Sequence, residues 1–175
     1  ASCFEGVNRL RKTHTGSPWP LGSTITQRGV NFSVAAPRAE ALELLIFETS
    51  SDSTPAEVIY LDRENQSGDY WHIEAEGLNA GCNYCYRVLG YKTNQEIKFF
   101  PNSLLLDPCA RAIGGWDVYT RSSSKKNFKD NQNFLKSVVS ERDLFDFASH
   151  PRPRHKWNKT IIYELIRTHN NCQAR

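Results

Sequence analysis

The chain has 175 residues, a net charge of +3, 39% hydrophobic residues and 23% charged residues. This composition is typical of a globular protein and excludes an intrinsically disordered one. One β-sandwich of about 100 residues fits within this length, whereas a (β/α)₈ barrel of about 250 residues does not fit beside it. The positive charge is spread along the chain, and no segment approaches the roughly 18 apolar residues of a membrane span, so neither nucleic acid nor a membrane is an expected partner.

Residues 1–18 are polar and contain turn-forming glycine and proline, which predicts a lead-in segment. From residue 21 onward apolar and polar residues alternate, as in strands with one buried face. Runs of this kind cover residues 29–34, 70–76 and 83–89. Residues 42–47 form a nearly continuous apolar run, as expected for a central strand, and residues 58–61 form another short run. Turn-forming residues separate all five runs. This pattern predicts an all-β fold, an immunoglobulin-like antiparallel β-sandwich over residues 19–115.

The pattern changes after residue 115. Residues 116–158 include the polar run Ser122–Lys126 and the proline- and arginine-rich run Pro151–Arg154, and they are predicted to form an irregular loop or linker. Residues 159–175 begin with a strand-like run, Thr160–Leu165, and end in a polar tail. We therefore expect the sandwich to carry an irregular C-terminal extension.

The five cysteines are odd in number and scattered along the chain, which does not indicate a disulfide framework and favours a reducing compartment. Cys82 and Cys85 have the two-residue gap of a zinc knuckle. No second pair has matching spacing, and residues three apart on a strand face opposite sides of a sheet. We therefore expect neither a metal nor a cofactor.

Six motifs occur in one order along the chain, and together they resemble the amino-terminal part of isoamylase-type debranching enzymes of the α-amylase superfamily. The motifs are Pro20–Gly22, Gly29–Ser33, Leu44–Phe47, Trp71–His72, Tyr84–Gly90 and Leu104–Pro108. In that family this part is a β-sandwich classed as a family 48 carbohydrate-binding module. The run Ile161–Leu165 is similar to the first strand of the family's catalytic barrel, which makes residues 159–175 the remnant of that strand and a divergent tail.

The resemblance implies a parent enzyme that hydrolyses α-1,6-glucosidic branch linkages in glycogen or starch. That reaction needs two carboxylates that flank the scissile bond, and in the family they lie on later barrel strands. We therefore assign no catalytic residue here and expect the chain alone to be inactive. The resemblance implies that the parent enzyme is located in the bacterial cytoplasm or in the plastid.

A glucose ring has apolar CH faces and a rim of hydroxyl groups, so sugar sites combine aromatic side chains with a few polar ones. The resemblance places the basic residue of such a site at Arg87 and the aromatic residue at Tyr91, with Lys92 adjacent. Strand alternation agrees, because Arg87 faces away from the side shared by Tyr84 and Tyr86. Three functions stay open: weak binding of α-glucan, bracing of the parent's catalytic barrel, and protein interaction without sugar affinity.

Four further residues carry large aromatic or polar side chains that could contact a ligand. Trp71 shares a face with Ile73 and belongs in the core by strand alternation, whereas His72 is expected on the surface. Trp19 and Trp116 lie in predicted loops and suit either a domain contact or a sugar contact.

Overall fold

The computed structural model describes residues 11–91, 103–119, 134–141, 149 and 156–161. The chain divides into two units, residues 1–142 and residues 143–175. Within the described part of the second unit the regular element is the short 3₁₀-helix η2 (Trp157–Lys159). No described helix is long and apolar enough to cross a membrane.

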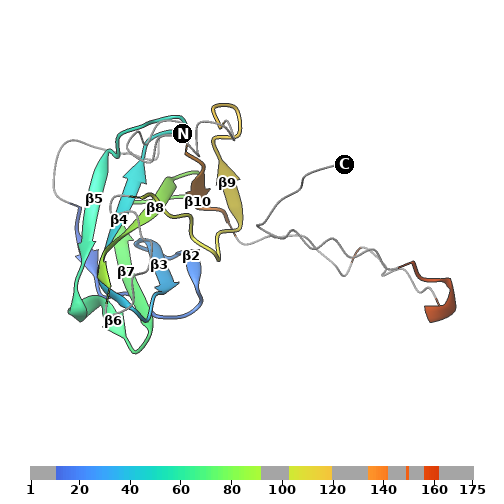
Figure 1. Ribbon diagram of the computed structural model, residues 1–175, viewed down its shortest axis with the longest axis horizontal. Helices are drawn as coiled ribbons and strands as arrows, with labels where there is room; N and C mark the ends of the chain where they lie inside the picture. The colour runs from blue at the N-terminus through green and yellow to red at the C-terminus, as the bar shows by residue number, and fades with distance from the viewer. Residues whose placement is uncertain (1–10, 92–102, 120–133, 142–148, 150–155, 162–175) are drawn as a thin grey trace. The chain divides into compact units, whose positions relative to one another are not determined.

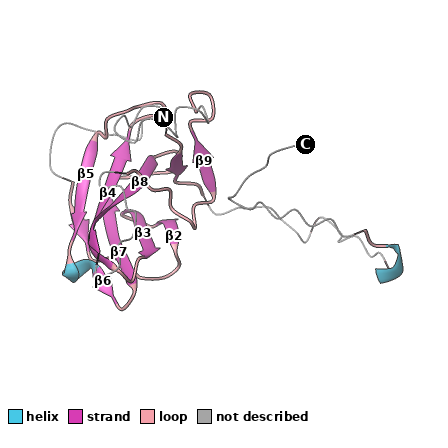
Figure 2. Cartoon of the chain, viewed as in Figure 1, coloured by secondary structure: helices cyan, strands magenta, loops and turns pink. Residues whose placement is uncertain are grey.

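The first unit contains two antiparallel sheets (Figures 1 and 2). One sheet has the order β1-β7-β3-β2, with β6 also paired to β7, and the other has the order β5-β4-β8-β10-β9. The first sheet comprises β1 (Thr13–His14), β2 (Gly22–Ile25), β3 (Gly29–Ala35), β6 (Gln66–Ser67) and β7 (Tyr70–Glu76). The second comprises β4 (Ala39–Phe47), β5 (Glu57–Leu61), β8 (Asn83–Tyr91), β9 (Ala112–Gly114) and β10 (Lys136–Val138), and the 3₁₀-helix η1 (Arg63–Asn65) follows β5. The predicted all-β antiparallel sandwich is confirmed.

Alternate side chains of the long strands meet between the two sheets and form the main core. Their members include Val30, Phe32 and Val34 of β3, Trp71, Ile73 and Ala75 of β7, Leu42, Leu44 and Ile46 of β4, and Tyr84, Tyr86 and Val88 of β8. Trp71 is fully buried, and its indole Nε1 donates a hydrogen bond to the carbonyl of Ala36 at 3.0 Å. The assignment of Trp71 to the core is thus confirmed.

The opposite face of β4 is also buried, which explains its almost continuous apolar sequence. Leu45 and Phe47 pack with Cys85 and Leu104 in a second, smaller cluster. The buried Lys136 lies over the ring of Phe47, with Nζ 4.7 Å from the ring centroid. Because β10 carries Lys136 and pairs with both β8 and β9, the sandwich extends past the predicted boundary at residue 115.

The segment Thr15–Trp19, which begins in the predicted lead-in, lies on the outer face of the first sheet, and we call it the strap. The side chain of Asn31 donates to the Ser17 carbonyl at 2.9 Å and accepts from the Ser17 amide at 2.8 Å. The His72 ring nitrogen Nδ1 lies 2.7 Å from the Thr15 carbonyl oxygen, and His72 is 3% exposed. The prediction of His72 as a surface residue is therefore wrong, because the strap covers the outward face of β7.

The described cysteines differ in their state. Cys85 and Cys109 are free thiols, whereas Cys82 is disulfide-bonded. Burial raises the pKa of the Cys85 thiol to about 12, so this thiol stays protonated near neutral pH. The redox compartment stays a prediction.

Candidate functional site

Arg87 lies on β8, on the outer face of the second sheet. Its neighbours Tyr86 and Val88 point into the core, as the alternation predicted. Arg87 stands directly opposite Glu43 of β4 in the sheet register, and its Nε donates to Glu43 Oε2 in an ion pair. Both side chains are partly exposed, so this charged pair is accessible to a ligand.

Tyr91 and Lys92 can be placed only in part. Tyr91 is the last residue of β8, and its backbone pairs with Ala39. The side chain of Tyr91 and the whole of Lys92 lie outside the described residues. Their place in a sugar site stays a prediction.

The sheet register brings a further aromatic residue to Arg87. Tyr60 of β5 stands opposite Glu43, on the other side from Arg87, so Tyr60, Glu43 and Arg87 form a line across three strands. We call this line the outer row. Neighbouring strands lie about 4.8 Å apart, so the backbone positions of Tyr60 and Arg87 are about 10 Å apart. Tyr60 is 57% exposed, a high value for an aromatic side chain on a sheet.

The outer row combines the three kinds of group that a sugar needs. Tyr60 offers an aromatic face for the CH face of a ring, Glu43 accepts hydrogen bonds and Arg87 donates them. The ion pair uses only Nε of Arg87, and neither Nη1 nor Nη2 has a hydrogen bond to another described residue. These nitrogens can therefore donate to hydroxyl oxygens while the carboxylate keeps the guanidinium in place.

The sequence singled out Arg87 as a candidate, but it did not single out Tyr60 or Glu43. The alternation of exposed Tyr60 with buried Ile59 and Leu61 is visible in the sequence and would have placed Tyr60 on an outer face. Tyr60 and Arg87 are close in space because of the order and register in which β5, β4 and β8 pair. No local sequence pattern specifies that order or register.

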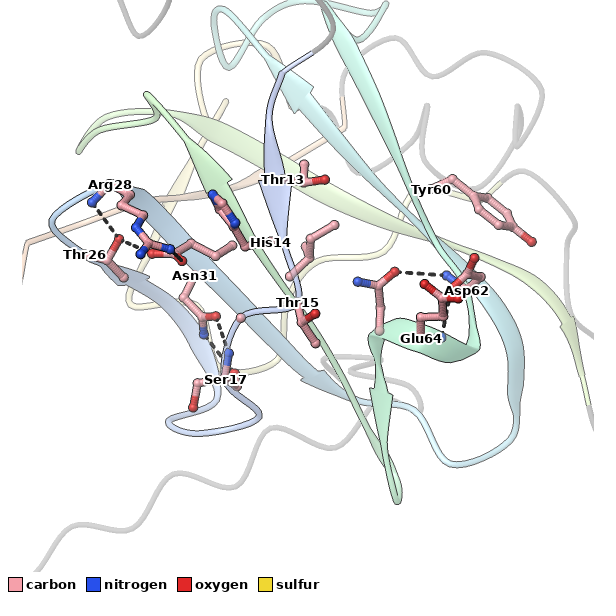
Figure 3. Close-up of a pocket in the computed structure, with 14 residues that line it drawn as sticks. Thr13, His14, Thr15, Ser17, Thr26, Arg28, Asn31, Tyr60, Asp62 and Glu64 are labelled. Atoms are coloured by element: carbon pink, nitrogen blue, oxygen red, sulfur yellow. Dashed lines mark hydrogen bonds and ion pairs between the residues drawn. The ribbon is translucent and has the colours of Figure 1, made fainter.

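A polar groove with a volume of about 790 Å³ lies beside the strap (Figure 3). Most of its lining is polar and comes from Thr13–Ser17, Thr26, Arg28, Asn31, Tyr60, Asp62, Glu64, Asn65, Ile73 and Glu74. Several of these side chains bind each other: Thr26 Oγ1 donates to Glu74 Oε1 at 2.6 Å, and Arg28 Nη1 lies 3.7 Å from Glu74 Oε2. Tyr60 is the one aromatic residue among these lining residues, and in Figure 3 its ring points away from the labelled polar side chains.

A second cavity, with a volume of about 540 Å³, is mostly apolar. Its lining comes from the β3–β4 connection, from β8 and from the segment after residue 104: Val34–Ala39, Leu42, Tyr86, Val88, Leu105, Leu106 and Pro108. Arg38 supplies the one charged side chain among these lining residues. Such a surface suits an apolar protein side chain better than a sugar.

Comparison with known proteins places this architecture in a family. The family described as carbohydrate-binding module 48 (isoamylase N-terminal domain) matches residues 20–110. A glycogen debranching enzyme of Pectobacterium carotovorum is 31% identical over 160 residues, which are 89% of this chain and 24% of that protein. A glycogen debranching enzyme of Erwinia tasmaniensis is 34% identical over 154 residues, covering 85% of this chain and 23% of that protein.

This chain thus spans about a quarter of the length of these relatives. Among solved structures, the catalytic module of the multi-modular glycogen-degrading pneumococcal virulence factor SpuA matches 73% of this chain and 17% of its own. The TM-score is 0.52 at 15% sequence identity, a likeness of fold alone. The family match covers more than half of the chain and coincides with the strands that build the sandwich. The chain belongs to the carbohydrate-binding module 48 family, the family of the isoamylase N-terminal domain.

Proposed function

We propose that this chain is the amino-terminal sandwich of a glycogen debranching enzyme, and that the sandwich itself binds α-glucan weakly through the outer row. The parent enzyme hydrolyses α-1,6-glucosidic branch linkages in glycogen or starch. The two debranching relatives and the family match support the parent's function. The observation that carries the binding role is the alignment of Tyr60, Glu43 and Arg87 on one exposed face.

In this proposal one glucose ring stacks its CH face on the ring of Tyr60. The free nitrogens of Arg87 donate to hydroxyl oxygens of the sugar, and Glu43 accepts from a hydroxyl group. Tyr91 and Lys92, further along the chain, extend the same contact. The affinity is low because hydrogen bonds at an exposed surface replace bonds to water and contribute little net free energy.

The chain alone has no role in bond cleavage in this proposal. A retaining glycosidase needs two carboxyl groups about 5–5.5 Å apart on either side of the scissile bond. The carboxylate of the outer row, Glu43, is instead ion-paired with Arg87. The sandwich therefore holds polysaccharide, and the parent's catalytic barrel supplies the acid and the nucleophile.

A second role, bracing of the catalytic barrel, rests on the apolar cavity. Ala35, Pro37 and Pro108 line it with apolar atoms, and its volume of about 540 Å³ is large enough for one or more apolar side chains. The two roles are compatible because the cavity and the outer row use different residues.

Affinity electrophoresis in gels that contain glycogen tests the binding role. We expect Arg87→Ala and Tyr60→Ala each to weaken the retardation of the chain several-fold, because each removes one of the two kinds of contact. Arg63→Ala is the matched control, since Arg63 is an exposed arginine in η1 outside the outer row. Equal retardation of all four proteins would reject the outer row as the site. Weakening by Arg63→Ala alone would do so too.

A further inference from the structure

A pair of exposed aromatic rings lies on the other sheet. Trp19, at the end of the strap, is 66% exposed, and Tyr70, the first residue of β7, is 38% exposed. Their ring centroids are 6.0 Å apart, and the ring planes are tilted by 45°. The two side chains thus present adjacent aromatic surface to solvent.

The backbone around both rings is fixed by hydrogen bonds. Ser17 Oγ donates to the Trp19 carbonyl at 2.8 Å, and the Trp19 amide lies 3.3 Å from the same Ser17 Oγ. Ser33 Oγ of β3 donates to the Pro18 carbonyl at 2.7 Å, which anchors the strap to the sheet. Tyr70 pairs with Ala35 on one side and Ser67 on the other. A ligand therefore meets a surface that needs little further ordering.

The shape of the pair matches a curved glucan chain. Successive rings of an α-1,4-linked glucan are inclined to each other, so two aromatic faces tilted by 45° can each contact one sugar. Asp69, the residue before Tyr70, is exposed, and its carboxylate has no hydrogen bond to another described residue. It can accept hydrogen bonds from sugar hydroxyl groups at the edge of the pair.

We propose that Trp19 and Tyr70 form a second α-glucan subsite, separate from the outer row. The inference depends on the proposed function for the identity of the ligand. It does not depend on the outer row itself, because Tyr70 belongs to the first sheet and Arg87 to the second. Two weak subsites on one sandwich increase the apparent affinity for a branched polymer.

The chain contains its own control for this proposal. Trp116 is 63% exposed and also lies beside a tyrosine, Tyr119, with ring centroids 5.9 Å apart. These two planes are inclined by 82°, so the edge of one ring meets the face of the other. The Trp116–Tyr119 pair therefore differs from the Trp19–Tyr70 pair in the angle between its rings. Trp116→Ala removes a tryptophan of almost equal exposure and serves as the control.

The experiment is affinity electrophoresis of the full chain in gels with graded glycogen. We expect Trp19→Ala and Tyr70→Ala to raise the apparent dissociation constant about tenfold, the scale of losing one aromatic stacking contact. Trp19→Phe and Tyr70→Phe keep a ring and should stay within about threefold of the wild type. Trp116→Ala should match the wild type. The double variant Trp19→Ala/Arg87→Ala should bind more weakly than either single variant.

The outcomes separate this inference from the proposed function. If Trp19→Ala binds glycogen normally and Arg87→Ala binds it weakly, the second subsite is overturned and the outer row is supported. The aromatic pair is then assigned to a protein contact. Weak binding by Trp19→Ala with normal binding by Arg87→Ala would support the second subsite and reject the outer row. A wild-type chain that glycogen does not retard would overturn both. Equal weakening by Trp19→Ala and Trp116→Ala would overturn the subsite as well.

Discussion

Asp107 is a buried carboxylate that connects three parts of the sandwich. The Tyr84 hydroxyl donates to Asp107 Oδ2 at 2.8 Å, and the Cys109 amide donates to Asp107 Oδ1 at 2.8 Å. The Asp107 amide itself donates to Ser137 Oγ of β10 at 2.9 Å. Burial raises the pKa of Asp107, and the hydrogen bonds from Cys109 and Tyr84 oppose that rise only in part. Burial of the Tyr84 hydroxyl group, together with the negative charge of Asp107, raises the pKa of Tyr84.

This shift predicts a pH dependence of stability. Because the pKa of Asp107 is higher in the folded protein than the ordinary value of 3.8, the folded state binds the proton more readily. The contribution of Asp107 to stability is therefore largest at acid pH and falls as the pH rises from 3.8 through the folded pKa. Asp107→Asn keeps the Oδ1 acceptor and cannot ionise.

Urea unfolding of wild type and Asp107→Asn between pH 3 and 7 checks this prediction. The wild type should lose stability relative to Asp107→Asn as the pH rises. All other titrating groups are common to both proteins, so the difference isolates Asp107. A difference that is constant over the range would contradict the assignment.

Lys136 is a second buried charged group, and its role is structural. Its Nζ donates to the carbonyls of Ser50 at 2.7 Å and Phe134 at 3.3 Å and lies over the ring of Phe47. Lys136→Met keeps the alkyl stem but leaves these two carbonyl oxygens without a donor. We expect a loss of about 1–3 kcal/mol in the free energy of unfolding.

Chemical denaturation measures this loss. Lys159→Met, at an exposed lysine of η2, is the control and should change stability by less than about 0.5 kcal/mol. Similar values for the two variants would show that the Lys136 hydrogen bonds do not stabilise the sandwich.

At the scale of elements, the strap determines which outward side chains of the first sheet reach solvent. Asn31, Ser33 and His72 point outward, yet all three are buried because they bind the backbone of the strap. The same bonds hold Trp19 beside Tyr70. A defect in the strap should therefore affect both stability and the aromatic pair.

Asn31→Ala tests this connection. It removes the two hydrogen bonds between Asn31 and Ser17 and should lower the free energy of unfolding by about 1–3 kcal/mol. The sharpest readout is hydrogen exchange of the Ser17 amide, which loses its acceptor and should exchange faster. Asn79→Ala, at an exposed asparagine, should leave that rate unchanged. An unchanged Ser17 rate in Asn31→Ala would mean that the strap is held by other contacts.

The long strands could be predicted from the sequence because one or both of their faces are buried. The runs at 29–34 and 70–76 alternate cleanly, and β3 and β7 contain them almost residue for residue. β10 was not predicted as a strand because three residues are too few to show a period, and one of them is the buried Lys136. The covering of His72 and the position of Tyr60 beside Glu43 depend on contacts between distant segments, and no local pattern encodes such contacts.

At the scale of the molecule, the first unit carries two chemically similar surfaces on different sheets. Tyr60 with Arg87 marks one, and Trp19 with Tyr70 marks the other. The proposed function depends on one claim, that this sandwich binds α-glucan at the outer row.

Titration of the ¹⁵N-labelled chain with maltoheptaose, followed by amide chemical shifts, tests that claim most directly. The account predicts saturable shifts for amides of β4, β5 and β8 around Tyr60, Glu43 and Arg87, and their disappearance in Arg87→Ala. Amides near Asn79, which lies in the connection between β7 and β8 and belongs to neither proposed surface, serve as the internal reference. A spectrum that stays unchanged at millimolar maltoheptaose, or that changes equally in wild type and Arg87→Ala, would contradict the account.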